Sequence, residues 1–300
     1  MAVVPLDGTL AVRTRARASR VRGAAKLAAA MALAAWAPSA AAQSCHGLAA
    51  TNLVFTNYTP FGPGVAATAT ITYNCPPPLT QAWIAISTPR TMNAGGNSLQ
   101  FEVYGDATHL AVWPDAPPQL VPASKSGSVT IYGFLPPQDA AAGSYAGTLT
   151  VSIYTGTTQN QTATATLAVS TSNFVNTCII GAGTLAFGTY DPLGANAAGP
   201  LDAQGTIQIA CTRATSYAVG LGAGNFASGT TRQMASGAQR LPYELYTDAG
   251  RGTVWNGTST VSGTAPSTSP ITLTVYGRIA GGQTAGAGSY SDTVQSTINF

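Results

Sequence analysis

The sequence predicts an all-β protein built from two antiparallel β-sandwich domains. Short segments alternate apolar and polar residues with the period of two that a half-buried strand requires. Glycine, proline, asparagine and serine interrupt these segments about every 8–12 residues, which is the strand spacing of sandwiches. The two halves of the chain also resemble each other, and no segment after the leader carries a helical stripe. One sandwich fold therefore occurs twice.

The first 42 residues have the pattern of a secretory signal peptide. A basic segment precedes the apolar run of residues 27–36, and Ala40-Ala41-Ala42 offers a cleavage site before Gln43. The run is shorter than the roughly 20 apolar residues that span a bilayer, and no later stretch qualifies, so we expect no membrane span. Six of the 13 Lys and Arg residues lie in the first 26 positions, so we expect no nucleic-acid partner.

Export allows the four cysteines to form disulfides. Four cysteines permit three pairings, and the repeat favours one bridge in each half, Cys45 with Cys75 and Cys178 with Cys211. Each bridge would close a loop of about 30 residues and stabilise the fold by roughly 3–4 kcal/mol. The alternative is a metal site that uses His46 or His109, but no CxxC or HxxxH spacing supports it. We therefore expect neither a metal nor another cofactor.

The repeat divides the chain into a leader at 1–42 and domains at 43–170 and 171–300. Residues 99–106 (LQFEVYGD) match residues 241–248 (LPYELYTD) at an offset of 142, and the same offset carries Trp113 to Trp255. Glu102 and Glu244 could suggest the carboxylate pair of a glycosidase. They recur once per half beside an arginine, which favours a structural ion pair or backbone hydrogen bond. No nucleophile elbow, P-loop or HExxH motif is present, so we expect no enzyme.

The two halves end differently. The first half follows its strand at 145–154 with another alternating segment at 162–169, whereas the second half ends in its 290–300 strand. This pattern predicts a second domain that is one strand short. Such a domain exposes an apolar groove that another chain can fill with a strand. The alternatives are closure by residues 172–178 and a sandwich that needs only six strands. The candidate groove residues are Tyr290, Val294, Ile298 and Phe300.

The second half resembles the spore coat protein U family, the pilins of archaic chaperone–usher systems. The resemblance is carried by residues 187–192 (FGTYDP), 232–234 (RQM), 241–246 (LPYELY) and 275–278 (VYGR), together with Cys178, Cys211 and Trp255. The first half is a looser version. It lacks the glycine that follows the phenylalanine at 187, and it has Gly133-Phe134 in place of Gly277-Arg278.

The resemblance implies immunoglobulin-like sandwiches, the second of them incomplete until a donated strand fills it. It also implies a periplasmic chaperone, an outer-membrane usher and an adjacent pilin as partners, and display on the cell surface. Cleavage after Ala42 would leave two residues before Cys45 and so no strand to donate. We therefore expect the two-domain tip adhesin of a pilus, acting in surface attachment and biofilm formation. The alternatives are a structural coat protein and an extracellular carbohydrate-binding module.

Proline-rich apolar connections in the first domain are the candidate adhesive loops. Prolines stiffen a loop and lower the entropic cost of ordering it on contact. An inward orientation that caps the sandwich is the alternative, and the sequence names no ligand. The candidate contact residues are Phe61, Val65, Leu79, Leu120, Val121, Phe134 and Leu135.

Overall fold

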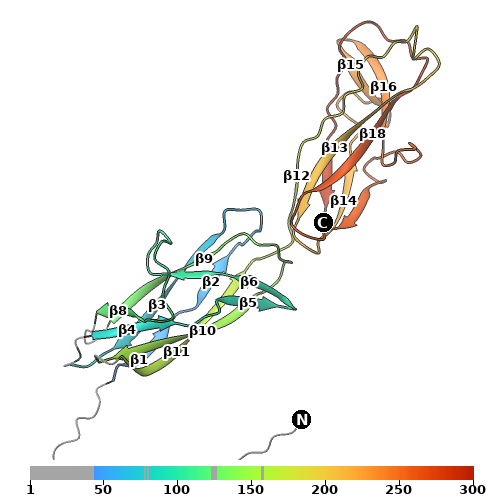
Figure 1. The fold of residues 1–300 in the computed structure, drawn as a ribbon. Helices are drawn as coiled ribbons and strands as arrows, with labels where there is room; N and C mark the ends of the chain where they lie inside the picture. Colours follow the sequence, from blue (N-terminus) through green and yellow to red (C-terminus); the bar gives the residue numbers. More distant parts are fainter. Residues whose placement is uncertain (1–43, 78, 80, 123–126, 157–158) are drawn as a thin grey trace, which may run out of the picture. The chain divides into compact units, whose positions relative to one another are not determined.

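The computed structural model describes residues 44–77, 79, 81–122, 127–156 and 159–300. The regular elements of these residues are all β-strands. These strands build two sandwiches (Figure 1). The described residues contain no helix of the length and apolarity needed to cross a membrane. The predicted leader and its cleavage site lie outside the described residues.

The first sandwich packs a four-stranded sheet against a seven-stranded sheet. The four-stranded sheet contains, in spatial order, β1 (His46–Ala50), β3 (Val65–Asn74), β9 (Gly127–Leu135) and β7 (Glu102–Tyr104). The other sheet contains, in order, β2 (Leu53–Thr56), β11 (Asn160–Ser172), β10 (Ala146–Thr155), β4 (Gln81–Ile86) and β8 (Gln119–Pro122). The short hairpin of β5 (Thr91–Ala94) and β6 (Asn97–Gln100) joins this sheet through β10.

The second sandwich packs a five-stranded sheet against a three-stranded sheet. The five-stranded sheet contains, in order, β12 (Cys178–Ile180), β13 (Leu201–Cys211), β18 (Ile271–Ile279), β16 (Gln239–Tyr246) and β15 (Arg232–Ser236). The other sheet contains, in order, β17 (Val261–Thr264), β14 (Ser216–Leu221) and β19 (Ser296–Asn299). The predicted two-sandwich fold is confirmed.

Each sandwich has its own apolar core and its own disulfide. The cysteine pairs are the predicted ones, Cys45–Cys75 and Cys178–Cys211, and each links the strand region that opens a sandwich to the end of its next long strand. Trp113 and Trp255 are both buried, and each donates from its indole Nε1 to a backbone carbonyl, that of Ile84 at 3.3 Å and that of Val219 at 2.8 Å. Because the two tryptophans correspond, their bonds identify Ile84 and Val219 as corresponding positions of the two sandwiches.

The strand β11 distinguishes the two sandwiches. Because Ile84 pairs with Ile153 and Val219 pairs with Ile298, β19 is the counterpart of β10. In the first sandwich β11 pairs with β10 and runs beside it (Figure 1). Among the described residues of the second sandwich, β19 pairs with β14 alone, so no strand takes the place of β11.

Candidate strand-accepting edge

In the first sandwich β11 lies between two neighbours. It pairs antiparallel with β10, from Ala146↔Ser170 to Thr155↔Asn160, and parallel with β2, from Val169↔Leu53 to Ser172↔Thr56. The alternation in its sequence sends Leu167 and Val169 inward, where they are 0% and 1% exposed. Insertion of β11 thus completes both the backbone hydrogen bonding and the apolar core.

The second sandwich contains counterparts of both strands that flank β11. The strand β19 corresponds to β10, and the segment around Leu185 and Phe187 corresponds to β2. These two side chains lie over Gly277, where an added Cβ would meet them at 3.0 and 2.8 Å, just as Leu53 and Phe55 lie over Gly133. The glycine makes this close approach possible. Leu185–Phe187 is nevertheless outside any strand in the described residues, because nothing pairs with it as β11 pairs with β2.

The side chains that face this vacant position are more exposed than their counterparts. In the first sandwich Tyr145, Leu149 and Ile153 are 1%, 2% and 0% exposed. The corresponding Tyr290, Val294 and Ile298 are half-buried, and Phe300, in line with the buried Thr155, is 59% exposed. Leu185 and Phe187 are half-buried as well, whereas Leu53 and Phe55 are fully buried. We call the set Leu185, Phe187, Tyr290, Val294 and Ile298 the acceptor edge.

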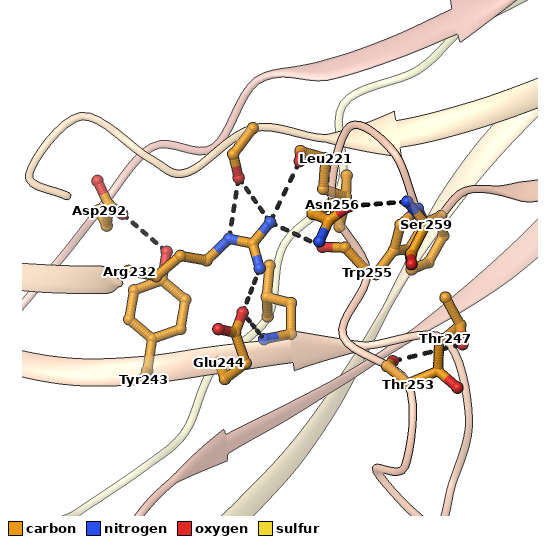
Figure 2. Close-up of polar contacts among 12 residues, drawn as sticks. Leu221, Arg232, Tyr243, Glu244, Thr247, Thr253, Trp255, Asn256, Ser259 and Asp292 are labelled. Carbon is orange, nitrogen blue, oxygen red and sulfur yellow. Dashed lines mark hydrogen bonds and ion pairs between the residues drawn. The ribbon is translucent and has the colours of Figure 1, made fainter. Parts of the chain in front are cut away.

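Arg232 anchors the acceptor edge to the rest of the sandwich. Its buried guanidinium forms an ion pair with Glu244 of β16, and it donates to the carbonyls of Leu221 at 3.2 Å, Gly222 at 2.6 Å and Trp255 at 2.8 Å (Figure 2). β15 and β16 belong to one sheet, and Leu221 ends β14, which carries β19 in the other. The arginine therefore joins the two sheets.

The first sandwich repeats this arrangement with Arg90. Its guanidinium forms an ion pair with Glu102 and donates to the carbonyls of Val103 at 3.2 Å and Trp113. Burial lowers the pKa of Arg90, and its Nε has no hydrogen-bond partner among the described residues. The predicted structural role of the two glutamates is confirmed by these ion pairs.

A second polar contact holds the segment that leads into β19. The buried Tyr243 hydroxyl donates to Asp292 Oδ2 at 2.7 Å (Figure 2). Asp292 Oδ1 accepts from the backbone N–H of Asn225 at 2.9 Å and of Thr293 at 2.8 Å. In the first sandwich Phe101 and Gly147 occupy these two positions, so the contact belongs to the second sandwich alone. Together with backbone hydrogen bonds from Gly222, Asn225 and Ala235, it holds residues 291–295 on the sandwich, and no described strand lies on their outer side.

The buried Tyr243 hydroxyl is expected to make the second sandwich sensitive to alkali. Burial, and then the hydrogen bond and charge of Asp292, raise the pKa of Tyr243 above its usual value near 10. The folded state therefore keeps a proton that the unfolded chain loses, and stability falls as the pH rises above about 10, by about 1.4 kcal/mol per pH unit. We expect a Tyr243→Phe variant to lose stability less steeply between pH 9 and pH 11 in calorimetry. Equal slopes for the two proteins would contradict this assignment.

The candidate adhesive residues lie at opposite ends of the first sandwich. Val65 pairs with Leu135 at one end of the β3–β9 ladder, and Tyr73 pairs with Gly127 at the other. Phe61, Val65, Phe134 and Leu135 belong to the first end, whereas Leu79, Leu120 and Val121 belong to the second, where β4 and β8 pair through Gln81 and Pro122. The set therefore does not form one surface.

For two of these residues, the predicted place in an exposed loop is wrong. Val121 and Leu135 are 4% and 0% exposed, because each occupies an inward position of a strand, β8 and β9, rather than a loop. Phe61, Val65, Leu79 and Phe134 are half-buried, and Leu120 is 58% exposed. Of the seven, Leu120 alone presents most of its side chain to solvent.

Some exposed apolar residues escaped sequence reasoning. Leu110 and Val112 are 84% and 53% exposed on the loop that follows β7. The Asp106 carboxylate accepts hydrogen bonds from Thr108 and from the N–H of Ala111 at 2.7 Å, which lowers its pKa to about 2. The same loop in the second sandwich has Asp248 in this role and Gly252 in place of Leu110. The offset of 142 places Leu110 opposite this glycine and could have identified it.

The described residues thus form two immunoglobulin-like sandwiches, the second with an unpaired edge at its last strand. The chain belongs to the Spore Coat Protein U domain family, whose model matches residues 29–152 and 163–297. It is 38% identical over 157 residues to Protein U of Myxococcus xanthus, an alignment that covers 46% of this chain and 86% of that protein.

A solved structure shares the fold. It is a chain of the CsuC–CsuE complex of chaperone and tip adhesion subunit from the archaic chaperone–usher Csu pili of Acinetobacter baumannii. The match has a TM-score of 0.52 at 16% identity and covers 86% of this chain and all of that one.

Proposed function

We propose that this chain is the adhesive tip subunit of a chaperone–usher pilus and that its second sandwich receives a strand from the next subunit. The observation that carries the proposal is the acceptor edge. The same positions are buried by β11 in the first sandwich and half-buried in the second, where no described strand covers them. An unpaired strand edge beside apolar side chains is a template for strand addition. A periplasmic chaperone would cover this edge before assembly at an outer-membrane usher.

The first sandwich supplies the geometry of the donated strand. A strand placed as β11 is would run antiparallel to β19 and parallel to the Leu185–Phe187 segment. It would enter beside Phe300 and leave beside Tyr290.

The first sandwich would then be free for contact with a surface, and we assign the chain no catalytic role. Fibres isolated from cells that produce this chain test its proposed position at the tip. Antibodies against the first sandwich are expected to label fibre ends only, and mass spectrometry of the exported chain is expected to find its N-terminus at Gln43. Label along the shaft, or a strand-length segment before Cys45, would contradict a tip subunit.

The proposed contact of the first sandwich with a surface has a separate test. Among the described residues of β1 to β11 and their connections, the large apolar side chains that are more than half exposed are Leu110, Val112 and Leu120. Their joint replacement by serine is expected to reduce the attachment of piliated cells to polystyrene several-fold, because apolar contact area is lost. Leu193→Ser is the matched control, since Leu193 is 94% exposed but lies in the second sandwich. Equal attachment by the triple variant and the control would exclude these three residues as contact sites.

The family description favours a second candidate, a structural coat protein. The Spore Coat Protein U match and the similarity to Protein U are the observations that favour it. Fractionation separates the two candidates. A coat protein would sediment with the cell or spore envelope after shearing, whereas a pilus subunit would be released with the sheared fibres.

A further inference from the structure

Phe174 closes an aromatic cluster at the end of β11. Its ring meets Tyr58 edge-on at a centroid distance of 4.9 Å and lies 5.8 Å from the ring of Tyr145. All three side chains are at most 5% exposed, and burial raises the pKa of both tyrosines. The backbone carbonyl of Phe174 also accepts from the N–H of Gly143 at 3.1 Å. Phe174, two positions after the end of β11, is thus buried together with the strand.

The second sandwich repeats both tyrosines of this cluster. Tyr58 donates to the carbonyl of Pro136 and accepts from the N–H of Gln138, and Tyr190 makes the same two bonds with Ala280 and Gln283 at 2.9 Å each. Tyr145 donates to Ala141 at 2.8 Å, and Tyr290 donates to Gly286 at 2.9 Å. Both hydroxyls of the second sandwich therefore bind one loop, residues 280–286, which sets the two rings as in the first.

The third aromatic ring is missing from the described residues of the second sandwich. Tyr190 and Tyr290 are half-buried, and neither has an aromatic partner among the described residues. The backbone of Tyr145 exchanges hydrogen bonds with Thr171 of β11, whereas the N–H and C=O of Tyr290 have no partner in this part of the chain. Among the described residues, this site therefore has no counterpart of β11 and none of Phe174.

We propose that Tyr190 and Tyr290 form a socket for an aromatic side chain of the subunit that donates the strand. This inference rests on the proposed function. β11 ends at Ser172, Asn173 turns the chain with a φ of 57°, and Phe174 enters the cluster. The donor would accordingly carry an aromatic residue two positions beyond the end of its strand, five positions after the inward residue that corresponds to Val169. The strand would supply affinity, and the aromatic residue would fix its register.

Aromatic character follows from the walls of the socket. Two tyrosine rings whose hydroxyls are already bonded to a loop present only their faces and edges, and edge-to-face contact with a third ring is favourable beyond simple burial. A charged or small residue at this donor position would leave the tyrosines partly solvated.

Synthetic peptides that copy residues 160–175 test the socket on the full chain. We expect the peptide with Phe174→Ser to bind about tenfold or more weakly than the unchanged peptide, from the apolar area of one phenylalanine. The matched control is the peptide with Val175→Ser, because Val175, three positions after β11, is 64% exposed. It is expected to bind like the unchanged peptide, with affinities measured by calorimetry.

Variants of the chain complete the test. In Tyr190→Ala the preference for Phe174 over Ser is expected to vanish, whereas Tyr190→Phe keeps the ring and should retain the preference. If the unchanged and Phe174→Ser peptides bind equally, the socket is wrong and the acceptor edge stands. If no peptide binds, the acceptor edge fails, and the proposed function fails with it.

Discussion

Extending the chain after Phe300 with a copy of residues 156–174 is expected to raise the melting temperature of the second sandwich by about 10 °C or more. Phe300 is the counterpart of Thr155, so the copy begins where the connection from β10 to β11 begins in the first sandwich. The copied strand would pair with β19 and cover the acceptor edge. Its counterparts of Leu167 and Val169 would each contribute about 1.5–3 kcal/mol on full burial.

Calorimetry of the extended chain measures this gain, and hydrogen exchange locates it. Protection should rise at Tyr290, whose N–H and C=O have no partner among the described residues, and around Leu185–Phe187. The control extension carries Leu167→Ser and Val169→Ser in the copy, which keeps the length and removes the buried side chains. An equal gain from both extensions would attribute the effect to length alone. The fully matched extension should also stop the chain from binding the peptide of residues 160–175.

Replacing Arg232 with methionine is expected to destabilise the second sandwich by about 3–5 kcal/mol, because a buried partner of several polar groups is removed. Arg232 is 2% exposed. The change leaves the carboxylate of Glu244 and the carbonyls of Leu221, Gly222 and Trp255 without the guanidinium that bonds them. Because these groups lie in both sheets, β14 and the β19 edge it carries would loosen together. Urea unfolding of the full chain measures the loss.

Two further variants separate the buried network from charge alone. Arg240→Met removes an arginine that donates to the exposed carbonyls of Gly237 and Gln239 and lies over Phe226, and it is expected to cost less than about 1 kcal/mol. Adding Glu244→Leu to Arg232→Met removes the stranded carboxylate and should recover part of the loss. A loss for Arg232→Met no larger than that for Arg240→Met would contradict the role of Arg232 as the link between sheets.

The sequence was sufficient for the strands and their duplication. Period-two alternation in 145–154 and 162–169 marks β10 and β11, and the shared offset pairs Arg90 with Arg232 and Trp113 with Trp255, so one structural role could be inferred twice. The disulfides followed from the same repeat. These features are local or are repeated, and a single chain shows them directly.

Other features depend on contacts between distant segments. Leu53 pairs with Val169, more than a hundred residues away, and no local pattern indicates that β11 lies beside β2. The predicted strand at 290–300 is regular only in Ser296–Asn299, and residues 290–295 have no strand on their outer side among the described residues. Two of the candidate adhesive residues, Val121 and Leu135, are buried in strands for a related reason. Prolines mark where strands end, but strand direction and inward orientation decide which residues share a surface.

The pairing of β11 also determines how the chain bears tension. A force that pulls the second sandwich away from the first would act along β11, whose ladder spans ten residue pairs with β10 and four with β2. Because these hydrogen bonds lie across the direction of pull, they share the load in shear and must break together, instead of opening one after another like a zipper. A donated strand seated on β19 in the same orientation would carry load in the same way, so that each joint of such a fibre would resist flow by the geometry that completes its fold.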